Sequence, residues 1–349
     1  MIRIGTGELA VEGSASALRG ALALSCATGA SFQWEGFRRK RKASPGFRAA
    51  DSEAVELFAQ LSGARREGGR LGEVAIEFEP ARPASGEHRF ELSPAGSMCP
   101  LLRAAAVSLV VATRDADIAS ELSLSGSTHA PGGETFEVTS STFGFFLRKL
   151  GVEWSLELAC AGFAPRGGGE VVLRISPAMA PMQGVELMAL GPLESIQIVS
   201  GGASLPAHVQ QRQAARARSG VHISGLEPTV QLVKLRSRSA GSVVATTGLF
   251  GEVPITVASV SQRGKSSEFV GEQAAANFRR VANQSAVVPE HLVDSLLPFL
   301  AFAAGESRFT TPRLPSNIRS HARLIHAFTD REVVIEGKTG QRGTIRVGA

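Results

Sequence analysis

The sequence has few cysteines and no spacing that would pair them. Cys26, Cys99 and Cys160 are the only three, and no Cys-x-x-Cys motif occurs. Zinc sites and disulfide frameworks need cysteines at close, regular intervals. Each of the three lies among apolar neighbours, which is typical of a buried free thiol. We therefore expect no zinc site, and we expect a reducing compartment, the cytoplasm.

The sequence also lacks long apolar runs. The longest stretches, such as residues 104–112, are about half the length that a membrane-crossing helix needs. The opening residues, MIRIGTGELAVEGSAS, have neither the basic start nor the apolar core of a signal peptide. We therefore expect no membrane partner.

Familiar catalytic signatures are missing as well. The sequence contains no GxxxxGK[ST] or GxGxxG loop, no HExxH motif and no GxSxG elbow. Its seven histidines form no pair with ligand spacing, so we expect no catalytic metal held by histidine. These absences give no support to a P-loop enzyme, a dinucleotide-binding enzyme, a zinc protease or a serine hydrolase.

The composition is that of a globular protein with a mildly basic surface. The chain has 349 residues, a length suited to two domains, with 43% hydrophobic and 20% charged residues. Lys and Arg number 37 against 32 Asp and Glu, which gives a net charge of +5. Such a surface suits an anionic partner, although many proteins without one are equally basic.

A unit of helix, strand, helix and hairpin is predicted three times. The first copy has a helix over 14–28, a strand over 31–37, a helix ending near Gly63 and a strand over 73–78. The next copies begin with helices over 97–113 and 289–304. In each hairpin the apolar spacing changes from 3.6 to 2 residues, as expected where a helix leads into a half-buried strand.

Residues 182–281 break this order and are predicted to form an inserted domain. They contain a strand over 195–199, a polar helix over 207–218 and an apolar run over 247–261. We therefore predict an α/β (α+β) fold with three repeats and a smaller inserted α/β domain. Residues 1–181 hold the first two repeats, and residues 282–349 hold the third.

Three segments could contact an anionic ligand, and each also has an ordinary structural explanation. Residues 37–48, FRRKRKASPGFR, form either a solvated loop or a phosphate-binding loop through Arg38, Arg39, Lys40, Arg41 and Lys42. Residues 161–170, AGFAPRGGGE, form either a tight hairpin or a close backbone approach to a ligand. The turn before helix 14–28 either binds phosphate or supplies an N-cap from Ser14 or Ser16.

Eight stretches in order resemble the RNA 3'-terminal phosphate cyclase family. They are LRGALALSCATG, the basic stretch ending SPGF, AGS at 95–97, SGSTH, GFAPRGGGEV, LPAHVQQRQ, SQRGKSSEFVGEQAA and EHLVDSLLPFLA. GFAPRGGGEV and EHLVDSLL are the most specific. The resemblance implies three repeats with an inserted domain, the same layout that the element order predicts.

The resemblance also implies a reaction and its participants. Active members use ATP to convert an RNA 3'-phosphate to a 2',3'-cyclic phosphate, through a histidine that first accepts AMP. It implies ATP, a divalent cation (Mg²⁺ by preference) and an RNA 3' end as partners, and it leaves the oligomeric state open. The positions matched to the nucleotide site are Glu12, Gly13, Arg19, Arg103, His129, His291, Asp294 and Ser295. Glu12 and Asp294 are the expected metal ligands.

Several positions depart from the family's pattern. The opening motif normally resembles DGSxGEGGGQILR, whereas this chain has Ser14, Ala15 and Ser16 after Gly13. Arg103 and Ser295 each stand where the family has glutamine. These changes put bulkier or shorter side chains where the backbone and amides of the family would approach a nucleotide.

The position of the nucleophile departs most from the family's pattern. Asn317 falls where the family has its histidine, and an amide cannot form a phosphoramidate. His321 follows one helical turn later on the same face, and it could substitute if the helix were shifted by a turn.

Three functions remain open. The first is a cyclase with an altered nucleophile, and the second is an inactive RNA-binding family member in RNA processing. The third is a related carbon–oxygen ligation or enolpyruvyl-transfer enzyme, for which no catalytic motif is visible.

Overall fold

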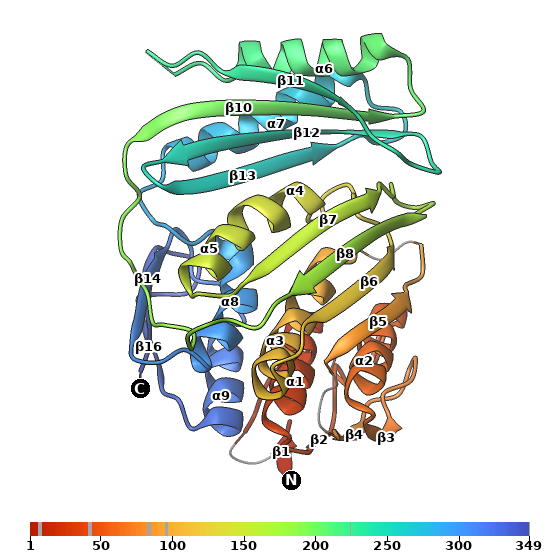
Figure 1. Ribbon diagram of the computed structural model, residues 1–349, viewed down its shortest axis with the longest axis vertical. Coiled ribbons are helices and arrows are strands. Elements are labelled where there is room, and N and C mark those ends of the chain that lie inside the picture. The colour runs from red at the N-terminus through yellow and green to blue at the C-terminus, as the bar shows by residue number, and fades with distance from the viewer. Residues whose placement is uncertain (6–8, 41–43, 82–84, 95–96, 224, 349) are drawn as a thin grey trace.

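The described residues form four sheets of four strands; the sheet of residues 193–260 lies at the top of the molecule in Figure 1, above the other three sheets and their helices. The computed structural model describes residues 1–348 apart from 6–8, 41–43, 82–84, 95–96 and 224. The predicted α/β class is confirmed. No helix in the described part of the chain is long and apolar enough to cross a membrane.

The first sheet is built from residues before 80. Its strands lie in the order β1-β2-β4-β3, with β1 parallel to β2 and the other pairs antiparallel. Its elements are β1 (Ile2–Ile4), α1 (Ala15–Thr28), β2 (Phe32–Trp34), α2 (Ala49–Ser62), β3 (Arg65–Gly68) and β4 (Ile76–Glu79).

The second and third sheets have the same order and pairing, β5-β6-β8-β7 and β9-β14-β16-β15. The second unit has β5 (Gly86–Glu91), α3 (Cys99–Ala116), β6 (Ser120–Gly126), α4 (Phe136–Val138), a π-helical turn (Thr139–Phe143), α5 (Gly144–Lys149), β7 (Trp154–Cys160) and β8 (Gly169–Ile175). The third has β9 (Glu186–Leu187), a 3-10 turn (Glu290–Leu292), α8 (Val293–Ala301), β14 (Ser307–Thr311), α9 (Ile318–Thr329), β15 (Val333–Glu336) and β16 (Gly343–Val347).

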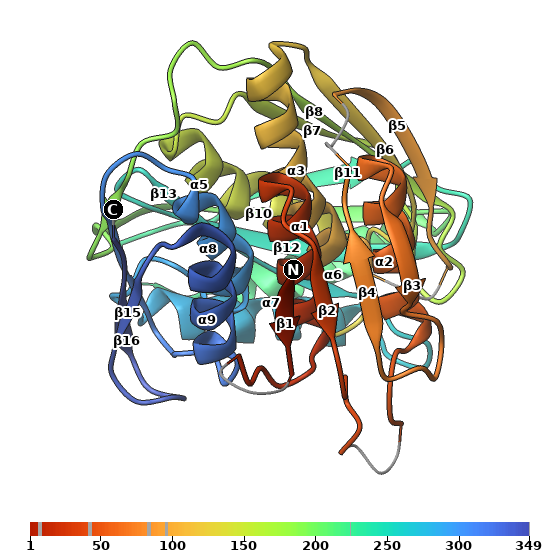
Figure 2. The ribbon, with the colours of Figure 1, turned by 90° about the horizontal axis from the view of Figure 1, so that it is seen from below.

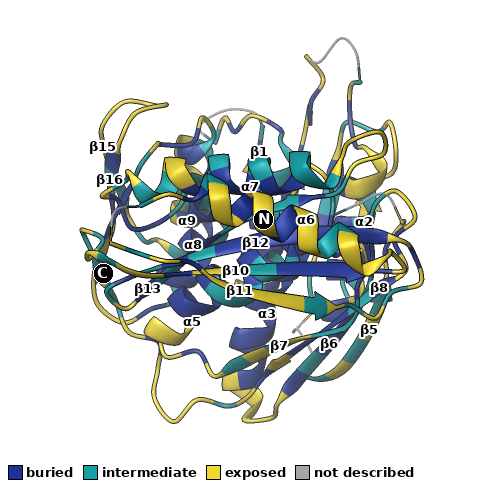
Figure 3. Ribbon diagram, turned by 90° about the horizontal axis from the view of Figure 1, so that it is seen from above, coloured by how far each residue is buried: buried dark blue, intermediate teal, exposed yellow. Residues whose placement is uncertain are grey.

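The fourth sheet belongs to residues 193–282, which we call the 193–282 unit. Its strand order is β11-β10-β12-β13. The elements are β10 (Leu193–Ala203), α6 (Ala207–Gly220), β11 (Thr229–Lys234), β12 (Gly241–Phe250), β13 (Val253–Val260) and α7 (Ser267–Ala282). Helices α6 and α7 pack on one face of this sheet, and their outward faces carry exposed residues (Figure 3).

Strands β3, β5, β9 and β11 and helices α4 and α7 had no predicted counterpart. Strands β3 and β5 alternate only between partly buried and exposed positions, and β9 is two residues long, so none of them has a strong apolar pattern. The residues of β11 are mostly exposed. Helix α7 does bury Val270, Ala274 and Phe278 at helical spacing, and the sequence analysis overlooked that signal. Strand β9 pairs with β14 although it lies inside the predicted insert, whose boundaries stay predictions.

Helix α1 is the centre of the molecule. It contacts α2, α3, α8 and α9, which lie around it when the molecule is seen from below (Figure 2). Its sequence is rich in Ala and Leu, which favour a helix and give surfaces that other helices can approach closely. The Ser14 side chain accepts a hydrogen bond from the Ala17 amide at 3.1 Å, and the helix ends at Gly29 with a φ of 76°. Of the two predicted caps, Ser14 is the one used.

Replacing Ser14 with Ala should lower the free energy of unfolding by about 1 kcal/mol, because the Ala17 amide loses its capping partner. Ser14→Asp should keep most of the stability, since its carboxylate can accept the same hydrogen bond. Urea unfolding of the three proteins measures this. Equal stability of the wild type and Ser14→Ala would contradict the capping role.

Candidate active site

The first turns of α1 and α9 meet at a cluster of polar side chains. The Asn317 side-chain amide donates to the Ser16 hydroxyl at 2.6 Å, and His321 Nε2 lies 3.3 Å from the same oxygen. Asn317 is the N-cap position of α9, so His321 lies one turn further on the same face. Two side chains of α9 therefore reach one hydroxyl of α1.

The imidazole of His321 is buried and uncharged at neutral pH. Only 2% of the residue is exposed, and burial lowers the pKa of His321 below its usual value near 6.5, although Asp294 opposes that effect. The Asp294 Oδ2 atom is 3.9 Å from Nε2. Gly20 of α1 makes room for the ring, since a Cβ there would lie 3.3 Å from Nδ1. A neutral imidazole can accept a proton or attack an electrophile through its unprotonated nitrogen, and Nε2 is the nitrogen that faces Ser16.

Arg103 places a buried positive charge beside this cluster. The residue is 1% exposed and forms an ion pair with Glu134. Its Nε donates to the Ser295 hydroxyl at 3.1 Å, and its Nη1 donates to Thr139 at 3.1 Å. Arg103 therefore joins α3 to the start of α8 and to the π-helical turn.

The departures from the family's pattern contact one another in pairs. Arg103 bonds Ser295, and both stand where the family has glutamine. Asn317 bonds Ser16, where the family has its histidine and a further glutamine. These four positions therefore form two hydrogen-bonded pairs in the folded chain.

Two openings flank Arg103. A small cavity of about 20 Å³ is lined by Ser16, Arg19 and Asp294 among others, which is room for one water molecule. A cleft of about 570 Å³ lies beyond Glu134 and is also lined by His291, Arg280 and Arg313. Arg103 therefore contacts one residue of each lining, Ser295 of the small cavity and Glu134 of the larger cleft.

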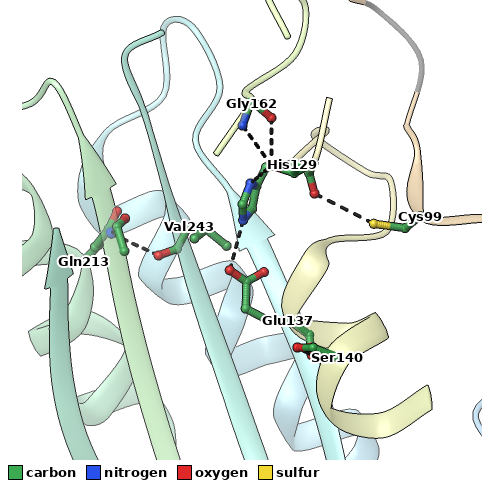
Figure 4. Close-up of polar contacts among 9 residues, drawn as sticks. Cys99, His129, Glu137, Ser140, Gly162, Gln213 and Val243 are labelled. Atoms are coloured by element: carbon green, nitrogen blue, oxygen red, sulfur yellow. Dashed lines mark hydrogen bonds and ion pairs between the residues drawn. The ribbon is translucent and has the colours of Figure 1, made fainter. Parts of the chain in front are cut away.

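His129 is held away from these openings. The residue is fully buried, with Nδ1 2.6 Å from the Thr128 hydroxyl and Nε2 2.9 Å from Glu137 Oε1 (Figure 4). Its ring also stacks on Phe163. Burial raises the pKa of Glu137, but the charge and hydrogen bond of His129 outweigh it and lower that pKa. Both nitrogens of His129 are engaged, and its predicted contact with a nucleotide stays a prediction.

Gly13 and Glu12 lie on the segment that leads into α1. A Cβ at Gly13 would lie 2.7 Å from the Arg38 amide nitrogen, so the close approach of two loops requires glycine there. Glu12 is exposed, and nothing in the structure places it against Asp294. Among the described residues, no three His, Cys, Asp or Glu side chains gather as metal ligands.

The basic loop divides into buried and exposed parts. Arg38 is 8% exposed, forms an ion pair with Asp51 and lies over the Phe37 ring, 4.9 Å from its centroid. Arg39 and Lys40 are exposed. Arg41 and Lys42 lie outside the described residues. A contact between this loop and RNA would therefore have to come from side chains other than that of Arg38.

Sequence reasoning did not identify Glu134, Thr139 or Glu137 as neighbours of the site. Thr139 and Arg103 are 36 positions apart, and Ser295 and Arg103 are 192 apart. The only local signal was the Gly132-Gly133 turn before Glu134, which permits a sharp change of direction.

The state of His321 predicts a pH dependence of stability. Its pKa is lower in the folded chain, so the unfolded chain binds the extra proton as pH falls below about 6.5. The free energy of unfolding should then decrease, by at most about 1.4 kcal/mol per pH unit for this one group. Above pH 6.5 this contribution is fully present.

Urea unfolding between pH 5 and 7.5 tests this dependence. His321→Gln should reduce the slope, and His291, whose pKa is also lowered by desolvation, accounts for a remainder. The matched control is His326→Gln, which removes an exposed histidine of the same helix. A wild-type slope retained in His321→Gln would exclude His321 as its source.

Comparison with known proteins gives the family of this chain. The family model for RNA 3'-terminal phosphate cyclase matches residues 10–335. The RNA 3'-terminal phosphate cyclase of Archaeoglobus fulgidus is 32% identical over 327 residues, covering 93% of this chain and 95% of the relative. That of Ectopseudomonas mendocina is 33% identical over 324 residues, covering 92% of each.

A solved structure of the enolpyruvyl transferase NikO from Streptomyces tendae gives a TM-score of only 0.29 at 9% identity. The match covers 99% of this chain and 65% of that one, and it is too slight to bear on fold or function. With the family model and both relatives extending over nearly its whole length, the chain belongs to the RNA 3'-terminal phosphate cyclase family.

Proposed function

We propose that this chain uses ATP to convert an RNA 3'-phosphate to a 2',3'-cyclic phosphate, with His321 as the residue that accepts AMP. The observation that carries the proposal is the position of His321. Its Nε2 lies 3.3 Å from Ser16, which Asn317 also contacts, so the imidazole reaches the place where the family's nucleophile is expected. Burial lowers the pKa of His321, which favours the neutral imidazole that a nucleophilic attack requires.

The proposed reaction has three transfers. His321 Nε2 attacks the α-phosphorus of ATP, a P–N bond forms, and pyrophosphate leaves with the electrons of the broken P–O bond. An oxygen of the RNA 3'-phosphate then displaces the imidazole. Finally the 2'-hydroxyl, losing its proton, attacks the activated 3'-phosphate, and AMP leaves as the cyclic phosphate closes.

Positive groups around the cluster suit the developing phosphate charge. Arg19 lines the small cavity next to Asp294, and the N-terminus of α1 presents free backbone N–H groups. Mg²⁺ characteristically binds one or two carboxylates together with nucleotide phosphates. Asp294 lines the small cavity and is the carboxylate that could hold such a cation, whereas Glu12 is exposed and does not line it, so the predicted pair is not brought together there.

A second candidate function is RNA binding without adenylation. Two observations favour it, namely that His321 is 2% exposed and that the adjoining cavity is only about 20 Å³. In this closed arrangement an α-phosphate can reach Nε2 only if residues around the small cavity move, because the cavity holds about one water molecule. The two candidates therefore differ in whether ATP opens the site.

Incubation with ATP labelled at the α-phosphate separates them. We expect the wild type to become covalently labelled, with an acid-labile, alkali-stable linkage typical of phosphoramidates. His321→Gln should abolish the label, while Asn317→Ala and the matched control His326→Gln should retain it. The same preparations should cyclise a 3'-phosphorylated RNA in proportion to their labelling.

Absence of both label and cyclised RNA in the wild type would reject the cyclase proposal. Asn317→His is then the decisive variant, because it returns an imidazole to the family's position. Label in Asn317→His alone would indicate a retained nucleotide site that lacks only its nucleophile.

A further inference from the structure

A second cleft lies at the junction of the second sheet with the 193–282 unit. It has a volume of about 800 Å³ and lies between the hairpin turn at 163–166 and the segment 261–267 that leads into α7. In Figure 1 this junction is at the right, where the ends of β7 and β8 approach those of β12 and β13. The junction is tight, with the Ala161 amide donating to the Arg236 carbonyl at 2.7 Å.

The charge of this cleft has one sign. Arg166, Arg263 and Lys265 line it, all three are exposed, and none has a carboxylate partner in the described part of the chain. No residue recorded as lining the cleft is acidic. Three cations this close repel one another unless an anion lies between them, so the cleft is suited to a polyanion.

Neutral groups in the same cleft suit phosphate oxygens. Ser261, Ser267 and Gln262 supply hydrogen-bond donors, and the N-terminus of the 16-residue helix α7 faces it at Ser266. Arg238 lies beside the glycine turn, since a Cβ at Gly168 would be 3.6 Å from its Cβ. The N-terminus of α7 adds to the positive potential that the side-chain cations already create in the cleft.

Exposed apolar residues lie in the same cleft as the cations. Pro131, Pro165 and Leu205 are exposed in the cleft, and Leu205 is among the few large exposed hydrophobic residues of the described chain. Unstacked bases bind apolar surfaces beside a charged groove that follows the backbone. A duplex keeps its bases inside, so this combination favours a single strand.

Consecutive residues at 131–134 line this cleft and the cleft of about 570 Å³. Pro131 lines the former, whereas the next residues, Gly132, Gly133 and Glu134, line the latter, beside Arg103. The two clefts lie at opposite ends of α7, one at Ser267 and the other at Arg280. At 1.5 Å per residue these ends are roughly 20 Å apart. A stacked strand would cover that distance with roughly six nucleotides at about 3.4 Å each.

We propose that the cleft of Arg166, Arg263 and Lys265 binds the backbone of single-stranded RNA several nucleotides upstream of the 3' end. The proposal rests on the proposed function for its substrate. It adds a binding surface on the 193–282 unit and the hairpin turn, distinct from the basic loop at residues 37–48. Substrate length then decides affinity, because only an RNA long enough to reach the cleft gains these contacts.

The test compares a triple variant with a charge-matched control. Arg166→Gln, Arg263→Gln and Lys265→Gln are combined in one protein. The control combines Arg65→Gln, Arg89→Gln and Arg308→Gln, which are exposed arginines of the first, second and third sheets without carboxylate partners among the described residues. Both proteins lose three positive charges, so a general loss of attraction affects them equally.

Binding is measured by fluorescence anisotropy with a 12-nucleotide RNA and a trinucleotide, both 3'-phosphorylated, over a range of salt. For the 12-mer the triple variant should bind about tenfold or more weakly, and the salt slope of log K should shrink by about 2. The control should bind like the wild type. Trinucleotide binding should be equal in all three proteins.

Equal 12-mer affinity in the triple variant and the control would overturn the proposal, as would an equal loss for the trinucleotide. Inorganic tripolyphosphate should compete with the 12-mer more strongly in the wild type and the control than in the triple variant, because the cleft is suited to a polyanion, and equal competition in all three would also count against the proposal. Labelling with α-labelled ATP is measured in parallel. A triple variant with normal labelling but weakened 12-mer binding supports the inference. A wild type that is not labelled rejects the proposed cyclase activity, and the 12-mer result then remains valid as a test of RNA binding.

Discussion

The contact between α1 and α9 at Ser16 is the constraint on which the account depends. Ser16 and Asn317 are 301 positions apart, yet their side chains are 2.6 Å from each other. Helix α1 is packed among four other helices, and the packing of α9 against it brings Asn317 and His321 to its N-terminus. Which side chains meet at Ser16 is therefore decided by helix packing as much as by residue type.

Arg103 adds a second constraint of a different kind. A buried guanidinium without partners is strongly destabilising, so its contacts with Glu134, Ser295 and Thr139 must be kept together. These partners come from separate elements, and the charge therefore fixes how α8 and the π-helical turn meet α3. Because Glu134 also lines the larger cleft, a ligand that displaced it would change the environment of the Ser16 cluster.

Local patterns predicted much of the fold and less of the site. Strand β14 and the start of α6 fall where the sequence placed them, because apolar spacing and flanking Pro or Gly residues are local signals. Strand β9 has only two residues. It pairs with β14, which lies far from it along the chain, and no local sequence pattern encodes such a pairing. The resemblance identified Arg103, Ser295, Ser16 and Asn317 as departures. It could not indicate that they contact one another in pairs, because that depends on tertiary packing.

The central claim is that His321, and not Asn317, is the group that meets the nucleotide. A crystal structure of the protein soaked with ATP tests it most directly. The account predicts AMP in the site with its phosphorus bonded to His321 Nε2 and with Arg19 and Arg103 near the phosphate oxygens. A nucleotide bound elsewhere, or bound here with His321 still buried against Ser16 and unmodified, would contradict it.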